Sequence, residues 1–254
     1  MQFSHVFLTR PQSESRDLAA MLAPLGMQPI IQPAFDFQQR DAAAGQAAVM
    51  ADLESGALAP LLIFTSPRAV QFGLCQLPVG LTRKVKVAAI GPATAKALEA
   101  AGVTVTVRPS NGYTSEALLH TLQEDSAGFV PVERTALILA APGGRRKLAK
   151  ELAERDWATQ MLMVYERKNA SLDKQELGRL HEAEKIISVW TSSNAMKSLS
   201  QRLPPASWFR LCQGDWLVIS NRLRRLARAY GPSEIHLSPG PTNSDLFTAI
   251  RGLV

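Results

Sequence analysis

Short segments rich in Gly, Ser, Thr, Asn, Pro and Arg follow the apolar runs of this chain, and they carry the side chains best suited to chemistry. Hydroxyl groups and the free backbone N–H groups at a helix start donate hydrogen bonds, and the positive end of the helix dipole favours an anion. The segments therefore predict binding of an anion such as a carboxylate or a phosphate. The candidate binding residues are Thr9, Arg10, Thr65, Ser66, Arg68, Gly91, Pro92, Thr94, Gly143, Gly144, Arg145, Thr191, Ser192, Ser193, Asn194 and Ser220.

The segment TSPRA, which contains Ser66 and Pro67, shows this pattern most clearly. Serine is a favoured helix N-cap, and proline is favoured at the first helical position. Gly91 and Pro92 form a similar start in IGPAT. We expect Ser66 to cap a helix, with contact to an anion as an additional role.

Tyr165 is the candidate for chemistry beyond binding. It lies at the end of the apolar run QMLMVYE, near the domain junction that the repeat below predicts, where its hydroxyl could reach a cleft between the domains. The alternative is a packed tyrosine whose hydroxyl is hydrogen-bonded within the protein.

Several familiar catalytic templates are missing from the sequence. There is no GxGxxG or GxxxxGK[ST] motif, which disfavours a dinucleotide or ATP site, and no GxSxG motif of serine hydrolases. The histidines His5, His120, His181 and His236 are scattered without metal-ligand spacing, so we expect surface or packed side chains.

Composition restricts the class of protein. The 254 residues carry a formal net charge of +6, which favours an anionic partner, although an ordinary basic surface explains the charge equally well. The basic run at 222–229 resembles a solvated helix face and lacks the interleaved aromatics of a base-stacking surface. No signal peptide or membrane-spanning apolar run is present, so we expect a soluble cytoplasmic protein. Cys75 and Cys212 have no CxxC spacing and are expected to be reduced, packed thiols.

Apolar runs typical of buried parallel strands alternate with helical patterns along the whole chain. The expected strands are 5–9, 29–32, 61–65, 85–90, 103–107, 136–140, 160–166, 186–191, 216–220 and 234–238. The expected helices include 16–25, 93–101, 115–123, 146–156, 223–230 and 244–250. So many strands favour two sheets over one.

An internal repeat supports two domains. Thr65 and Thr191 are equivalent at an offset of 191 − 65 = 126, and Ser115 and Ser244 at 244 − 115 = 129. The unit that begins LILAAPGG has no counterpart after the last match and instead resembles the start of the chain. Similar βα units can also arise from shared physics alone.

The simplest topology is one domain inserted into another. We expect an α/β fold of two similar doubly wound, flavodoxin-like parallel-sheet domains. The outer domain would comprise 1–37 and 169–254, and the inserted domain 38–165. A two-stranded connector would lie near 32–40 and 163–170. Ligands of such sheets bind at the carboxyl ends of the strands, where the candidate residues lie.

Together, LTRP, FTSPRAV, AIGPATAKALEAAG, VYER and WTSSNAM resemble the uroporphyrinogen-III synthase family, in order and spacing along nearly the whole chain. The resemblance implies a bilobed fold and cyclisation of the linear tetrapyrrole hydroxymethylbilane, with loss of water and inversion of the last pyrrole ring. It implies no cofactor and no metal. The family's tyrosine matches Tyr165, as an acid or as a residue that orients the substrate. Leu223 stands where Thr94 falls in the other repeat, which argues against a catalytic threonine there.

Two other classes of function stay open. The first is a two-lobed protein that binds an anionic small molecule without catalysis. The second, a nucleic-acid binder that uses the basic run at 222–229, is disfavoured. We expect a monomer with a small polycarboxylate substrate, because no heptad pattern or exposed apolar helix indicates a protein partner, and no membrane association.

Overall fold

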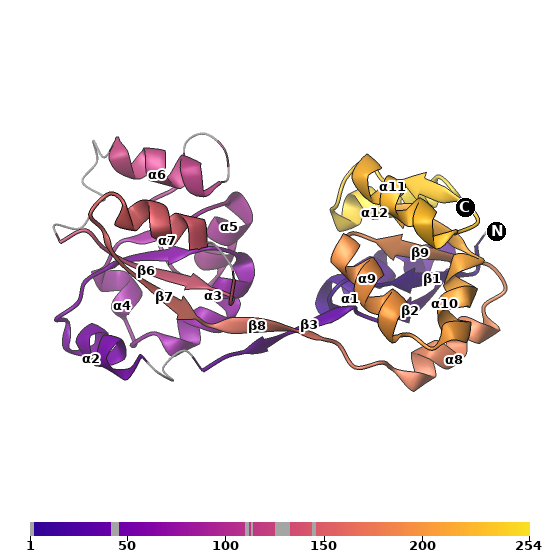
Figure 1. The fold of residues 1–254 in the computed structure, drawn as a ribbon, viewed down its shortest axis with the longest axis horizontal. Coiled ribbons are helices and arrows are strands. Elements are labelled where there is room, and N and C mark those ends of the chain that lie inside the picture. Colours follow the sequence, from indigo (N-terminus) through magenta and orange to yellow (C-terminus); the bar gives the residue numbers. More distant parts are fainter. Residues whose placement is uncertain (1–2, 42–45, 110–111, 113, 125–132, 144–145) are drawn as a thin grey trace. The chain divides into compact units, whose positions relative to one another are not determined.

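The computed structural model describes residues 3–41, 46–109, 112, 114–124, 133–143 and 146–254. The chain divides into two compact units (Figure 1). Unit 1 comprises Met1–Phe37 and Lys168–Val254, and unit 2 comprises Gln38–Arg167. Each unit is an α/β structure around its own parallel sheet.

Unit 1 has a five-stranded parallel sheet with the strand order β11-β10-β9-β1-β2. Its strands are β1 (His5–Leu8), β2 (Gln28–Ile31), β9 (Ile186–Trp190), β10 (Asp215–Val218) and β11 (Ile235–Leu237). Its helices are α1 (Gln12–Leu22), α8 (Lys174–Glu182), α9 (Ser193–Arg202), α10 (Pro205–Cys212), α11 (Asn221–Ala227) and α12 (Asn243–Arg251), with short 3-10 turns at Ala23–Leu25 and Arg228–Tyr230. Helices α1 and α12 share one core cluster, and α8 to α11 pack into the other.

Unit 2 has a four-stranded parallel sheet with the strand order β5-β4-β6-β7. Its strands are β4 (Leu61–Phe64), β5 (Val87–Ala89), β6 (Thr135–Ala140) and β7 (Ala158–Met163). Its helices are α2 (Ala47–Ser55), α3 (Pro67–Gly73), α4 (Leu81–Lys84), α5 (Pro92–Ala100), α6 (Ser115–Gln123) and α7 (Arg146–Ala153), with a 3-10 turn at Leu74–Gln76. Residues of α2 to α5 form one core cluster with the sheet, and α6 and α7 form the other.

The two sheets have the same strand order. In unit 1, β10-β9-β1-β2 corresponds to β5-β4-β6-β7 in unit 2, so β6 and β7 take the places of β1 and β2. This is the permuted repeat that the sequence indicated, and the predicted fold class is confirmed. The place of β11 is taken in unit 2 by a single bridge between Val107 and Ala88.

That bridge corrects the expectation of a strand at 103–107. Thr106 bonds to Val87 with both side chain and backbone: its Oγ1 accepts from the N–H of Val87 at 2.8 Å and donates to the Val87 oxygen at 3.0 Å, and its own N–H donates to the same oxygen at 2.8 Å. Only Val107 continues the ladder, with its oxygen accepting from Ala89 N at 3.1 Å. Alternating β-branched residues alone therefore did not make an edge strand.

The expected strand at 160–166 is two strands. β7 ends at Met163, and β8 (Tyr165–Asn169) pairs with β3 (Phe35–Gln39) in a separate two-stranded sheet. Val164 is the point of change, because its N–H donates to Ala140 of β6 and its oxygen accepts from the N–H of Arg40, both at 3.0 Å.

Helix boundaries differ from expectation where prolines and turns decide them. The helix expected at 16–25 begins at Gln12, directly after Pro11, and its α-helical part ends at Leu22, before a 3-10 turn that contains Pro24. The helix expected at 146–156 ends at Ala153, ahead of Asp156 with its positive φ of 61°. The helix at 115–123 is as predicted.

Two further expectations concern the surface. None of the helices in the described part of the chain is long and apolar enough to cross a membrane. Both cysteines are free, but Cys75 is exposed, so its prediction as a packed thiol was wrong, whereas Cys212 is half-buried and its burial raises the pKa of the thiol.

Candidate functional site

The serine at the carboxyl end of β4 caps α3, as predicted. Ser66 has extended backbone angles of φ −164° and ψ 162°, and its Oγ accepts from the N–H of Ala69 at 3.1 Å. Pro67 occupies the first helical turn. The next strand of the sheet, β5, is followed in the same way by Gly91 as the N-cap of α5 and by Pro92 in its first turn.

Tyr165 lies against this helix start. Its hydroxyl oxygen is 3.1 Å from Ser66 Oγ, and its ring stacks on Phe72 with the centroids 5.8 Å apart at 25°. Ser66 is the N-cap of α3 and Phe72 lies in its last turn, so one helix holds both the ring and the hydroxyl of the half-buried tyrosine. The structure thus brings together two of the predicted site residues.

The packing of α3 fixes this arrangement. Gly73 allows close approach, because a Cβ at this position would lie 2.6 Å from Leu139 Cδ2 and 3.4 Å from the methyl groups of Val164. Gln76, the last residue of the 3-10 turn that follows α3, donates from Nε2 to the main-chain oxygens of Phe72 at 2.6 Å and Val164 at 3.2 Å. The residue before Tyr165 is therefore tied to the same helix.

Three predicted threonines make bonds or contacts inside the protein. Thr9 is 3% exposed, and its hydroxyl donates to the Val189 oxygen at 2.7 Å. Thr65 donates in the same way to the Leu139 oxygen at 2.8 Å. Thr94 is also 3% exposed. These bonds join neighbouring strand ends, and a ligand contact by the three side chains stays a prediction.

The sheet of unit 1 repeats the serine caps. Ser192, after β9, caps α9 by accepting from the N–H of Asn194 at 3.2 Å. Ser220, after β10, caps α11 by accepting from the N–H of Leu223 at 3.3 Å. Thr191 and Ser193 beside them are half-buried. Donors therefore gather at the carboxyl edge of this sheet as they do in unit 2.

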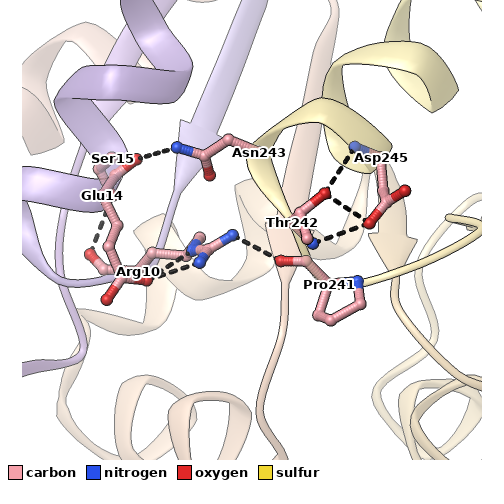
Figure 2. Close-up of polar contacts among 7 residues, drawn as sticks. All are labelled: Arg10, Glu14, Ser15, Pro241, Thr242, Asn243 and Asp245. Carbon is pink, nitrogen blue, oxygen red and sulfur yellow. Dashed lines mark hydrogen bonds and ion pairs between the residues drawn. The ribbon is translucent and has the colours of Figure 1, made fainter. Parts of the chain in front are cut away.

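Arg10, the predicted cation of unit 1, already has protein partners (Figure 2). Its Nε and Nη2 donate to Glu14 Oε2 at 3.0 and 2.6 Å, and its Nη1 donates to the oxygen of Pro241 at 2.8 Å. Asn243 joins the same cluster by donating from Nδ2 to the main-chain oxygen of Glu14 at 3.1 Å. The guanidinium side chain is only 14% exposed, so a ligand carboxylate would have to compete with Glu14.

The loop that Arg10 contacts leads into a capped helix. Thr242 and Asp245 form a capping box at the start of α12, with Thr242 Oγ1 donating to Asp245 Oδ2 at 2.6 Å (Figure 2). Hydrogen bonds from the side chain and backbone of Thr242 lower the pKa of the Asp245 carboxyl.

The remaining predicted binding residues are more scattered. Arg68 is half-buried at the second position of α3, Asn194 is exposed in α9, and Gly143 is exposed with a positive φ of 77°. Gly144 and Arg145 lie outside the described residues. Their roles as ligand contacts stay predictions.

Among the described residues, one group could hold a metal ion: Asp215, Glu234 and His236, whose ligand atoms lie within 4.8 Å of one another. Sequence spacing did not reveal it, because Asp215 and His236 meet only through the pairing of β10 with β11. His236 Nε2 lies 2.9 Å from Asp215 Oδ2, so these two side chains are hydrogen-bond partners of each other. Asp215 is the first residue of β10, at the edge opposite the serine caps.

Two parallel α/β units, each with serine-capped helices at the carboxyl edge of its sheet and linked by a two-stranded connector, define this chain as a two-domain α/β protein of permuted-repeat type. The family model described as "Uroporphyrinogen-III synthase HemD" matches residues 16–248. The chain belongs to the uroporphyrinogen-III synthase family.

Curated relatives agree with this assignment. The chain is 28% identical to the uroporphyrinogen-III synthase of Escherichia coli K12 over 256 residues, covering 97% of this chain and 99% of the relative. It is 30% identical to that of Salmonella typhimurium over 257 residues, with the same coverage of 97% and 99%.

Solved structures agree in fold. Uroporphyrinogen-III synthetase from Helicobacter pylori has a TM-score of 0.59 at 16% identity, covering 98% of this chain and 99% of that one. A mutant uroporphyrinogen III synthase from Thermus thermophilus has a TM-score of 0.54 at 19% identity, covering 98% of each chain. The predicted family and fold are thereby confirmed.

Proposed function

We propose that this protein is a uroporphyrinogen-III synthase, which closes hydroxymethylbilane to uroporphyrinogen III. The observation that carries this conclusion is the family match over residues 16–248, together with relatives aligned over 97% of the chain. Binding without catalysis is not favoured, because the curated relatives are enzymes by name.

The reaction removes water and forms one carbon–carbon bond. The bond between the hydroxymethyl carbon and its oxygen breaks, and the oxygen leaves as water with one added proton. To invert the last pyrrole ring, the bond between its substituted α-carbon and the bridging carbon breaks. That α-carbon bonds to the former hydroxymethyl carbon, and the bridging carbon bonds to the free α-carbon, which loses a proton, so that one carbon–carbon bond is gained net. No electrons are gained or lost overall, so the reaction needs no oxidant or reductant. We propose that the protein uses no resident cofactor.

Binding of the substrate falls to the donors at the strand ends. The acetate and propionate groups of a linear tetrapyrrole are carboxylates, which accept hydrogen bonds from serine hydroxyls and backbone N–H groups. Ser192 and Ser220 in unit 1 and Gly91 in unit 2 occupy such places. The net charge of +6 attracts the substrate by long-range electrostatics.

Tyr165 is proposed as the catalytic residue that gives a proton to the departing hydroxyl. It is half-buried, and its ring and hydroxyl are held by α3 through Phe72 and Ser66. Proton donation by a positioned side chain is worth about 10²- to 10⁴-fold in rate. The remaining acceleration comes from holding the end rings so that inverted closure is faster than spontaneous uninverted closure.

We also propose a cytoplasmic monomer that has a small tetrapyrrole substrate and binds no nucleic acid. The basic residues Arg222, Arg224 and Arg225 are exposed on α11, as expected of a solvated helix face. If they formed a nucleic-acid surface instead, the protein would be retained on DNA in a salt-sensitive way.

The decisive experiment supplies hydroxymethylbilane to the purified protein and resolves the product porphyrins by isomer after oxidation. The proposal expects isomer III, formed faster than the spontaneous product. Isomer I alone, formed at the uncatalysed rate, would overturn the proposal and leave a binding protein. A matched sample with heat-denatured protein gives the uncatalysed rate under identical conditions.

A further inference from the structure

Helix α3 contacts Tyr165 in two chemically different ways. The ring of Phe72 stacks on the tyrosine ring, and Ser66 Oγ lies 3.1 Å from the tyrosine oxygen. Packing explains the first contact. The second is a polar contact between two hydroxyl groups, and its direction decides what the tyrosine proton can do.

The hydrogen-bonding capacity of Ser66 is limited. A serine hydroxyl has one proton to donate and two lone pairs to accept with. One lone pair is used by the N–H of Ala69 at 3.1 Å, which caps α3. The serine proton and the second lone pair remain, and either hydroxyl of the pair can be the donor.

We propose that Ser66 is a positioning residue that donates its proton to the oxygen of Tyr165. This inference rests on the proposed function, in which Tyr165 is the proton donor. With Ser66 donating, the phenol proton is not used in this hydrogen bond and can pass to the hydroxymethyl oxygen of the substrate. If Tyr165 donated to Ser66 instead, that proton would be withheld from the substrate.

The proton transfer leaves a phenolate on Tyr165, and the hydrogen bond from Ser66 stabilises that phenolate. The carbon–oxygen bond of the substrate breaks, its electron pair stays on the oxygen, and that oxygen takes the phenol proton and leaves as water. The phenolate of Tyr165 keeps the hydrogen bond from Ser66 and recovers a proton from the substrate when the closed ring becomes aromatic again. Hydrogen bonds to a charged group are roughly twice as strong as neutral ones, so the Ser66 bond strengthens as the proton leaves.

The bond to Ala69 contributes to the same effect. Its N–H donates to Ser66 Oγ, which polarises the serine O–H and makes it a better donor. Ala69 N–H, Ser66 and Tyr165 thus form a chain of hydrogen bonds that all run toward the tyrosine oxygen. The residues of this chain of hydrogen bonds all lie in unit 2.

The test is a double-mutant cycle on Ser66 and Tyr165. Ser66→Gly removes the hydroxyl but largely keeps the helix start, because glycine is itself an acceptable N-cap. Ser66→Thr keeps a hydroxyl at the same place. Tyr165→Phe removes the proposed acid. Turnover of hydroxymethylbilane to isomer III is measured for each variant and for Ser66→Gly combined with Tyr165→Phe.

The proposal expects Ser66→Gly to lower kcat by about 10- to 100-fold with KM changed less than about threefold, as for a bond that matters most in the transition state. Ser66→Thr restores most of kcat. In the Tyr165→Phe background, Ser66→Gly has less than about a threefold effect, because residues that act as one unit are non-additive. Thr114→Gly, which removes the N-cap of α6 in the same unit, leaves kcat unchanged.

Other outcomes overturn the inference in distinct ways. Fully additive losses in the double variant show that Ser66 acts independently of Tyr165. A raised KM with unchanged kcat shows that Ser66 only binds a carboxylate of the substrate. Circular dichroism of each variant excludes a folding defect. If the unaltered protein produces isomer I alone, the proposed function itself fails, which is a different result from any of these.

Discussion

The guanidinium of Arg10 donates from Nη1 to the main-chain oxygen of Pro241 at 2.8 Å, although 231 positions separate the two residues. The same guanidinium is paired with Glu14 in α1, and Pro241 precedes the capping box of α12. Leu18 of α1 and Leu246 of α12 share a core cluster. Arg10 therefore joins the starts of two helices that pack on one side of the unit 1 sheet.

Removing the hydrogen bonds that Arg10 makes to Glu14 and Pro241 should destabilise unit 1. Arg10→Met is expected to lower the free energy of unfolding by about 1 to 3 kcal/mol, since hydrogen bonds to charged groups contribute in that range. Urea titration followed by tryptophan fluorescence reports mainly on unit 1, because three of the four tryptophans, Trp190, Trp208 and Trp216, cluster there, whereas Trp157 lies in unit 2. The exposed Arg16 of α1 is the matched control, and Arg16→Met should change stability by less than about 0.5 kcal/mol. Unchanged stability with a raised KM would instead make Arg10 a substrate ligand.

Glu116 of α6 should titrate far below an ordinary glutamate. A hydrogen bond from Lys147 of α7 is the largest cause that lowers its pKa from 4.5 to about 2, and hydrogen bonds from its own backbone N–H and from Thr114, with the charge of Lys147, lower the pKa further. Because the pKa in the folded protein is lower, the ion pair stabilises the fold above pH 4.5 and this contribution is lost as pH falls from 4.5 through about 2.

NMR titration of the Glu116 carboxyl carbon checks this directly. Lys147→Met should move the midpoint up toward 4.5, whereas Lys150→Met in the same helix, whose lysine pairs with Glu154 at 3.7 Å, should leave it near 2. A midpoint near 4.5 in the unaltered protein would show that the pair does not form in solution.

Two glycines should respond in opposite directions to alanine. A Cβ on Gly214 would lie 2.7 Å from the main-chain oxygen of Ile186, so Gly214→Ala should cost about 1 to 3 kcal/mol of stability through overpacking. Gly178 lies exposed in α8 with no atom within 4 Å of the added Cβ, and Gly178→Ala should stabilise by about 0.5 to 1 kcal/mol. Thermal unfolding of both variants measures the difference. A gain for Gly214→Ala would contradict the close contact with β9.

Tyr165→Phe should lower turnover while the fold is kept. The phenylalanine ring retains the stack on Phe72, and the hydroxyl bond to Ser66 is lost, at a cost of about 0.5 to 1.5 kcal/mol. Tyr230→Phe is the control, since Tyr230 packs against Trp208 and Trp216 in unit 1 and should leave turnover unchanged. The measurement is the initial rate of isomer III formation. Unchanged turnover for Tyr165→Phe would leave this tyrosine with a packing role.

Much of the fold could be predicted because buried strands and helices have characteristic patterns of apolar residues in the local sequence. All residues of β9 are buried, and the run IISVWT predicted that strand from its apolar residues alone. The change of sheet at Val164 left no such pattern, since the apolar run continues through it. It depends on Arg40 and Ala140, the residues that bond to Val164 from other parts of the chain.

The candidate site was predictable to the same extent. The cap by Ser66 follows from neighbouring residues, because serine before proline favours a helix start, and the structure confirms it. Its contact with Tyr165 spans 99 positions, and no local pattern encodes it. The pairing of Arg10 was missed for the same reason, since Pro241 comes near it only through the fold.

The interruption of unit 1 by unit 2 sets an order of folding during synthesis. β1 needs β9 as a neighbour, with His5 opposite Ile186, and all of Gln38–Arg167 is made between them. Domains generally fold as units as the chain leaves the ribosome, so the continuous unit 2 can be complete while the paired strands β1 and β2 still lack β9. Until β9 emerges, the apolar β1 exposes an unpaired edge that can aggregate. Unit 1 is therefore the last of the two units to be complete, although part of it is made before unit 2.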